Sequence, residues 1–85
     1  MNILKVLPKL SYLYLKSNEI NQIKPGVFRN NSLLEYLDLD NNKIEYLGIE
    51  LFYGLVTLKY IYLQGNKLQY LHPETFVGLP NLQSL

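Results

Sequence analysis

The chain has 85 residues, with eight basic and seven acidic side chains and no cysteine. This length allows one domain at most, and the balanced charge gives no electrostatic reason to expect nucleic acid or an anionic membrane as a partner. Disulfide bonds are excluded, and with a single histidine the chain lacks the ligand set of a structural zinc site.

The first segment, residues 1–9, is apolar only in short stretches. It lacks the continuous apolar stretch of a signal peptide, and no segment of the chain is long and apolar enough to form a membrane-spanning helix. We therefore predict no direct membrane contact.

From Leu10 onward, the same residue types recur every 24 residues. This recurrence predicts three complete repeats, 10–33, 34–57 and 58–81, within a single array that covers residues 1–85. The recurring positions are Leu10, Leu34, Leu58 and Leu82; Leu13, Leu37, Ile61 and Leu85; Leu15, Leu39 and Leu63; Ile20, Ile44 and Leu68; Ile23, Leu47 and Leu71; and Phe28, Phe52 and Phe76.

Each repeat opens with a predicted β-strand. In the first repeat, Leu13 and Leu15 alternate with Tyr12 and Tyr14, so the leucines point toward the core and the tyrosines away from it. Successive repeats are expected to place these strands side by side in one parallel sheet. The phenylalanine of each repeat is expected to fill the space behind the sheet.

An asparagine follows each predicted strand. A buried amide at this place can bond backbone groups of its own and the neighbouring repeat, which would otherwise be buried without a partner. Stacking the repeats is expected to turn these bonds into a ladder of Asn18, Asn42 and Asn66.

One repeat departs from the pattern. Leu7, Leu55 and Leu79 share a position that Asn31 occupies in the first complete repeat. The polar side chain predicts that the turn over residues 29–32 is looser than the others, or reaches solvent.

The segment 10–20 matches the pattern L-x-x-L-x-L-x-x-N-x-L, as do residues 34–44 and 58–68. The chain therefore resembles the leucine-rich repeat family, and its 24-residue repeats with a phenylalanine resemble the class common in extracellular Slit-like, Toll-like and variable-lymphocyte-receptor-like ectodomains. The resemblance implies an α/β solenoid: a right-handed coil with a concave parallel sheet and an irregular or 3-10 helical convex side. Stability in such an array resides in the interfaces between repeats.

Both ends of the chain carry partial repeats. Residues 1–9 end a preceding repeat, with Leu4 in the phenylalanine position, and residues 82–85 begin the next one. Because repeat arrays close with polar caps, which are cysteine-rich in the extracellular class, we interpret the chain as part of a longer protein. Leu4, Leu7, Leu82 and Leu85 are expected to face water, where end-to-end self-association is an alternative.

The outward strand positions form the candidate ligand-binding face, because leucine-rich repeats usually bind on the concave side. Tyrosine supplies rigid, amphipathic contact area at low entropy cost, so tyrosines around carboxylates resemble a binding surface. The alternative is that tyrosine simply suits a strand and packs on its cross-strand neighbours. The rows are Tyr12, Tyr36 and Tyr60; Tyr14, Asp38 and Tyr62; and Lys16, Asp40 and Gln64.

Three further features bear on chemistry. Asn30 begins the sequon Asn-Asn-Ser, a candidate glycosylation site on the convex return that chance also explains in an asparagine-rich repeat. Asp38 begins a run like a calcium loop, but Lys43 and Ile49 stand where that loop needs glycine and glutamate, so no metal site is predicted and contact with a basic partner is favoured. His72 has no nucleophile at a recognisable spacing and is interpreted as a solvated loop residue.

The resemblance implies a protein-binding module: the concave face of an extracellular receptor, adhesion or innate-immune ectodomain, with a protein ligand and without a cofactor. Two alternatives stay open, namely spacer repeats whose parent protein binds its ligand elsewhere, and an intracellular scaffold. No catalytic motif is present in the sequence, so an enzyme is not predicted.

Overall fold

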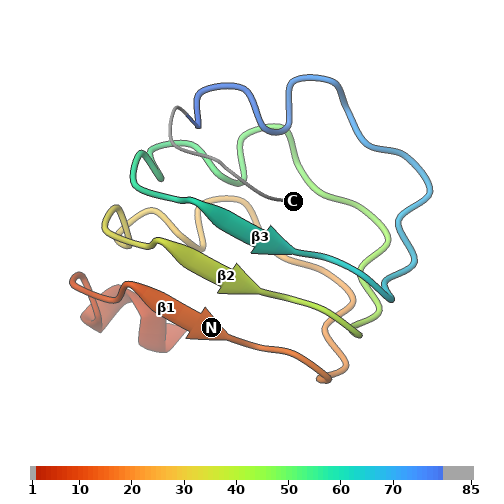
Figure 1. Cartoon of the computed structure of the whole chain (residues 1–85), viewed down its shortest axis with the longest axis horizontal. Helices are drawn as coiled ribbons and strands as arrows, with labels where there is room; N and C mark the ends of the chain where they lie inside the picture. Colours follow the sequence, from red (N-terminus) through yellow and green to blue (C-terminus); the bar gives the residue numbers. More distant parts are fainter. Residues whose placement is uncertain (1, 80–85) are drawn as a thin grey trace.

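The structure is a computed structural model that describes residues 2–79. A short 3-10 helix, η1 (Asn2–Val6), precedes three strands: β1 (Tyr12–Tyr14), β2 (Tyr36–Asp38) and β3 (Tyr60–Tyr62). After β1 and after β2 the chain turns, runs back behind the sheet and returns to begin the next strand alongside (Figure 1). The predicted start of a further repeat at residues 82–85 lies outside the described residues.

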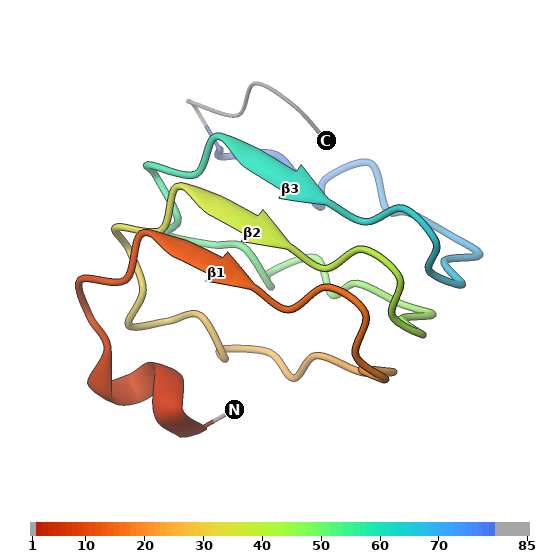
Figure 2. The same cartoon turned by 60° about the horizontal axis from the view of Figure 1, so that its bottom comes forward.

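The three strands form one parallel sheet in the order β1-β2-β3. Tyr12 is paired with Tyr36, and Tyr36 with Tyr60, so each strand is aligned with the residue 24 positions further along the chain. The return segments lie on one side of the sheet and consist of turns and irregular backbone (Figures 1 and 2). The predicted solenoid, with a parallel sheet and an irregular opposite side, is therefore confirmed.

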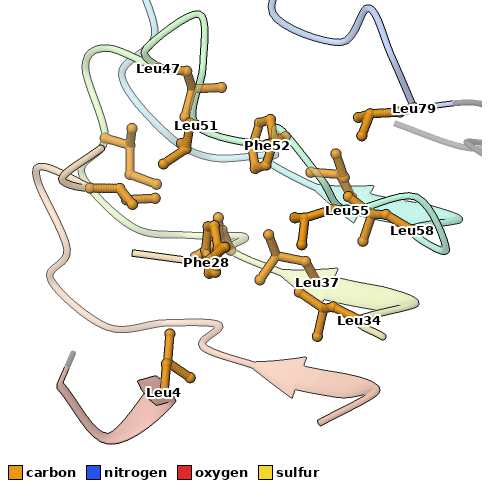
Figure 3. Packing of buried hydrophobic residues seen from close by; sticks show 14 residues of the cluster. Leu4, Phe28, Leu34, Leu37, Leu47, Leu51, Phe52, Leu55, Leu58 and Leu79 are labelled. Carbon is orange, nitrogen blue, oxygen red and sulfur yellow. The ribbon is translucent and has the colours of Figure 1, made fainter. Parts of the chain in front are cut away.

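The core fills the space between the sheet and the return segments (Figure 3). Leu37, Leu39 and Ile61 point into it from the strands and the residues just after them, and are fully buried. Behind them the phenylalanine rings stack, with centroids 6.2 Å apart for Phe28 and Phe52 and 5.7 Å for Phe52 and Phe76. The inward residues of β2 and β3 are therefore buried, while Leu13, the inward residue of the edge strand β1, is half-buried.

The expectation that Leu4 faces water was wrong. Leu4 is only 2% exposed and lies next to Phe28, where it continues the phenylalanine column (Figure 3). Helix η1 turns Leu4 into the core, while Leu7, just beyond the helix, is 40% exposed as expected. The predicted exposure of Leu82 and Leu85 falls outside the described residues, and end-to-end association stays a prediction.

The asparagines after the strands join one repeat to the next. The Asn42 amide donates to the carbonyls of Leu15 and Leu39, each at 3.0 Å, and its oxygen accepts the N–H of Ile20 at 3.1 Å. Asn66 repeats this pattern one turn on, donating to the Leu39 carbonyl at 2.9 Å. Each side chain therefore satisfies backbone groups in two repeats.

Asn18 stands at the first position of the same column. Its amide donates to the Leu15 carbonyl at 2.8 Å and to the Lys16 carbonyl at 3.3 Å, both in its own repeat, and its side chain is exposed. Asn18 thus makes the local bonds of the column without the bonds between repeats that Asn42 makes.

We expected the turn over residues 29–32 to be loose or to reach solvent, and this expectation was wrong for Asn31, within the turn. Asn31 is fully buried, and its amide donates to the carbonyls of Leu4 and Leu7, each at 3.1 Å. A leucine at this position could not make those bonds. Asn31 therefore attaches η1 and the residues after it to the first complete repeat.

A second recurring feature is a left-handed residue just before each of these asparagines. Ser17, Asn41 and Gly65 have φ angles of 60°, 57° and 74°. This conformation reverses the chain as it leaves the sheet, and it favours glycine and asparagine over most residues. The mixed residue types at this position gave no recurring signal in the sequence.

Candidate binding face

Five tyrosine side chains from the three strands share the outward side of the sheet. We call this cluster the tyrosine face. Because alternate residues of a strand point to opposite sides, the first and third residue of each strand lie here. The strand register aligns them in the two predicted rows, which are Tyr12, Tyr36 and Tyr60, and Tyr14, Asp38 and Tyr62.

Tyr36 is the centre of the tyrosine face. Its ring centroid lies 5.0 Å from that of Tyr14 and 5.2 Å from that of Tyr62. The rings of Tyr12 and Tyr60 lie 5.7 and 6.0 Å away. These separations are in the range in which aromatic pairs attract one another, so the five rings form one packed layer.

The rings differ in exposure. Tyr14 is 62% exposed and Tyr12 is 53% exposed, whereas Tyr36, Tyr60 and Tyr62 are half-buried. The five tyrosines take the outward positions that the sequence predicts, but three of them are only partly exposed, because the rings pack against one another. Mutual contact between the rings leaves Tyr12 and Tyr14, on β1, as the most exposed members of the layer.

The surroundings of Tyr36 change its acid–base behaviour. Its pKa is raised above the ordinary value of 10.0, chiefly because neighbouring groups remove water from its hydroxyl. The negative charges of an ionised Tyr62 and of Asp38 raise the pKa further. Tyr36 consequently keeps its proton, and its ability to donate a hydrogen bond, to a higher pH than an isolated tyrosine.

Asp38 lies in the outward row but is only 9% exposed. Its Oδ1 accepts the backbone N–H of Asp40 at 3.0 Å. The sequence predicts that the side chain points outward, which the register supports, but not that its neighbours cover it. The spacing of residues in the sequence carries no information on how far neighbouring side chains cover an outward residue.

The third predicted row lies just beyond the strands. Backbone pairing continues there, since Ser17 donates to the Asp40 carbonyl at 2.9 Å and Asn41 donates to that of Gln64 at 2.7 Å. Asp40 Oδ1 also accepts the N–H of Gln64 at 2.7 Å. Lys16 and Gln64 are exposed, and Asp40 is half-buried between them in the row.

The remaining candidates lie apart from the tyrosine face. Asn30 is exposed, and the next residue, Asn31, is buried. His72 is half-buried, where a solvated residue is expected, and its Nδ1 accepts the N–H of Glu74 at 3.0 Å. Within residues 2–79, no group of three His, Asp or Glu side chains is arranged to hold a metal ion.

Comparison with known protein families decides the identity of the repeats. A family model described as Leucine rich repeat matches residues 2–44 and again residues 33–85. The chain belongs to the leucine-rich repeat family. No curated protein matches the chain in a sequence comparison. In the described part of this leucine-rich repeat chain, no helix has the length and apolar character needed to cross a membrane.

Family membership carries a coarse functional statement. Leucine-rich repeats are typically non-enzymatic and form protein-interaction modules, which agrees with an outward face of packed tyrosines. The resemblance to the extracellular class of leucine-rich repeats stays a prediction.

Proposed function

We propose that the tyrosine face of this leucine-rich repeat array binds a protein ligand as part of an extracellular receptor, adhesion or innate-immune ectodomain. The observation that carries the proposal is the layer of Tyr36 and the four tyrosine rings around it, of which Tyr12 and Tyr14 are more than half exposed. Tyrosines held by their neighbours lose little further freedom when a partner covers them, which favours binding.

The size of the face limits its affinity. Three strands of three residues cover about 10 by 14 Å at a rise of ~3.3 Å and a spacing of ~4.8 Å. A standard protein interface covers ~800 Å² on each partner. We therefore expect weak binding by this chain and stronger binding when further repeats extend the face.

A peptide selection tests the proposal. Peptides are selected from a random displayed library against the chain, and their affinities are measured for two variants, Tyr14→Ser and Tyr46→Ser. Both tyrosines are 62% exposed, but Tyr46 lies outside the sheet and away from the tyrosine face. The two substitutions therefore remove equal exposed aromatic groups from different sides.

We expect Tyr14→Ser to weaken most selected peptides by about tenfold, as removal of an aromatic contact residue often does, while Tyr46→Ser leaves them unchanged. Peptides that depend on Tyr46 and not on Tyr14 would overturn the proposal. Peptides that depend on neither would favour the alternative in which these repeats are a spacer and the ligand binds elsewhere.

The extracellular assignment is supported by the accessible sequon, since the Asn30 side chain is exposed. Expression through the secretory pathway of animal cells should yield a chain whose mass falls on enzymatic removal of N-linked glycans, and Asn30→Gln should abolish that change. A secreted chain that carries no glycan at Asn30 would remove this support and would favour the alternative of an intracellular scaffold.

A further inference from the structure

Two carboxylates beside the tyrosine face, Asp38 and Asp40, form no ion pair within residues 2–79. Asp38 lies between Tyr14 and Tyr62 in its row, and Asp40 follows it two residues on. The ion pairs among residues 2–79 join Lys43 to Glu19 at 3.8 Å and Lys59 to Glu35 at 3.6 Å. Neither pair includes Asp38 or Asp40, so within residues 2–79 no lysine, arginine or histidine nitrogen lies at ion-pair distance from either carboxylate.

The two carboxylates are already oriented. Asp38 Oδ1 accepts the Asp40 N–H, and Asp40 Oδ1 accepts the Gln64 N–H. Each carboxylate uses one oxygen in these bonds and can accept more, since an ionised carboxyl group has about four acceptor positions. Because these hydrogen bonds already fix the two side chains, the carboxylates lose less conformational entropy when a partner binds.

Because Asp38 is buried, its carboxylate is less favourable in free energy when no cation lies nearby. A charged group that loses its water without gaining an opposite charge is unfavourable, and Asp38 is nine-tenths covered. A ligand that covers the tyrosine face removes the rest of that water. The ligand must therefore bring a positive charge to this place, or bear the full cost of burying the carboxylate.

The surrounding rings favour the same charge. The faces of tyrosine rings are electron-rich and attract cations, and arginine stacks on them more readily than lysine because its guanidinium is planar and weakly hydrated. The guanidinium also donates several hydrogen bonds at once, which suits two neighbouring carboxylates. Tyr14, 62% exposed beside Asp38, offers such a ring.

We propose that the ligand presents an arginine side chain, which contacts the tyrosine layer beside Tyr14 and donates hydrogen bonds to Asp38 and Asp40. This inference rests on the proposed function and specifies the chemistry of the partner. It places the guanidinium at the border between the rings and the third row, on the β2 strand.

The test uses two probes of nearly the same size and shape: N-acetyl-arginine amide and its citrulline analogue, in which a neutral urea replaces the charged guanidinium. Each is titrated into the chain, and shifts of the backbone amide signals are followed by nuclear magnetic resonance. Asp38→Asn keeps an oxygen that can accept the Asp40 N–H, so it removes the charge without removing that bond. Glu45→Gln, at an exposed residue outside the sheet, is the matched loss of one negative charge.

We expect the arginine probe to shift amides of residues 36–40 and 60–64 and the citrulline probe to shift them far less. Asp38→Asn should weaken the arginine probe by about tenfold, the usual effect of losing a charged hydrogen-bond partner, and Glu45→Gln should leave it unchanged.

Equal effects of the two probes, shifts confined to other residues, or equal weakening by Asp38→Asn and Glu45→Gln would each overturn the inference. These failures differ from failure of the proposed function, which the peptide selection reports through Tyr14 whatever the charge of the peptide. Peptides whose binding needs Tyr14 but is unchanged by Asp38→Asn would support the proposed function and contradict the inference that the ligand presents an arginine.

Discussion

Two polar side chains, Asn31 and Thr75, are buried at positions where the other repeats carry apolar residues. Asn31 uses its amide group to hold the carbonyls of Leu4 and Leu7, but its oxygen has no partner. The Thr75 hydroxyl is also buried without a partner, at 1% exposure. A buried polar atom without a partner costs about 1–3 kcal/mol of stability. In Asn31 the two hydrogen bonds of the amide offset this cost, whereas the Thr75 hydroxyl makes no hydrogen bond that could offset it.

Thr75→Val is expected to stabilise the chain by about 1 kcal/mol, because valine has the same shape and lacks the unpaired hydroxyl. Urea unfolding followed by circular dichroism measures the change. Thr57→Val serves as the contrast, since the Thr57 hydroxyl donates to the carbonyls of Ser32 and Leu34 at 3.1 and 2.9 Å. Stabilisation by Thr57→Val, or loss of stability in Thr75→Val, would contradict this reading of the hydroxyls.

Tyr36 predicts how stability depends on pH in the alkaline range. Its folded pKa lies above 10.0, so below about pH 10 both the folded and the unfolded chain keep the proton and its contribution to stability is complete. As the pH rises through the raised pKa, the unfolded chain loses the proton first and stability falls. Tyr36→Phe, which cannot ionise, should lose less stability between about pH 9 and pH 11 than the parent chain.

Urea midpoints at the two pH values give the comparison, with Tyr46→Phe as the control for an exposed tyrosine outside the sheet. The same loss of stability in Tyr36→Phe and Tyr46→Phe would show that Tyr36 is not the group responsible.

At the scale of the element, each strand is short and depends on the turn that comes after it. The residue that turns the chain out of the sheet is left-handed in all three repeats, at Ser17, Asn41 and Gly65. In the second and third repeats, the asparagine that comes next bonds the strand to its neighbour. Strand, left-handed residue and asparagine thus form one unit, and each strand stays aligned because the turn after it is fixed.

Gly65→Ala is expected to destabilise the chain by about 1–2 kcal/mol, because a side chain disfavours the left-handed conformation. A Cβ added at Gly65 would also meet the side-chain amide of Asn41. Gly48→Ala is the control, since an added Cβ there meets nothing within 4 Å and no left-handed backbone is required. Thermal unfolding of both variants measures the difference, and equal effects would contradict the role given to the turn.

At the scale of the whole molecule, stability resides between repeats. Leu4, Phe28, Phe52 and Phe76 form one column through the core, and Asn42 bonds groups of two repeats. A single 24-residue repeat buries too few apolar groups to offset the ordering of its backbone, so repeats fold by stacking. The same stacking builds the tyrosine face, because each strand contributes only its outward residues.

The asparagine column gives a direct test of stability between repeats. Asn42→Ala removes bonds to Ile20, Leu15 and Leu39 and should cost about 2–4 kcal/mol, since it leaves buried backbone groups without partners. Asn18→Ala removes exposed bonds within one repeat and should cost less than about 1 kcal/mol. Chemical denaturation compares the two, and similar costs would show that the ladder does not connect the repeats.

Most of the fold could be predicted from the sequence because the period is strict. A 24-residue recurrence fixes the strand register, and the alternation in Leu13-Tyr14-Leu15 fixes the outward side. Features that depend on a single repeat could not be predicted in this way. Asn31 broke the pattern, and the sequence did not show that carbonyls of the preceding segment would be within its reach.

The candidate site was predictable to the same degree. Its rows follow from the register, but the exposure of each ring does not, because it depends on how closely the Tyr36 ring packs with Tyr14 and Tyr62. The sequence pattern did not predict the burial of Asp38 either. The exposure of a side chain on the outward face depends on its neighbours in three dimensions. Residue spacing alone therefore cannot predict which of these side chains are most exposed.

The most direct test of the binding face is hydrogen–deuterium exchange of the chain with and without a peptide obtained from the displayed library. We expect the peptide to slow amide exchange in β1, β2 and β3 and in the residues immediately after them, and to leave residues 46–53 on the opposite side unchanged. Slower exchange confined to residues 46–53, with the strands unaffected, would contradict binding on the tyrosine face.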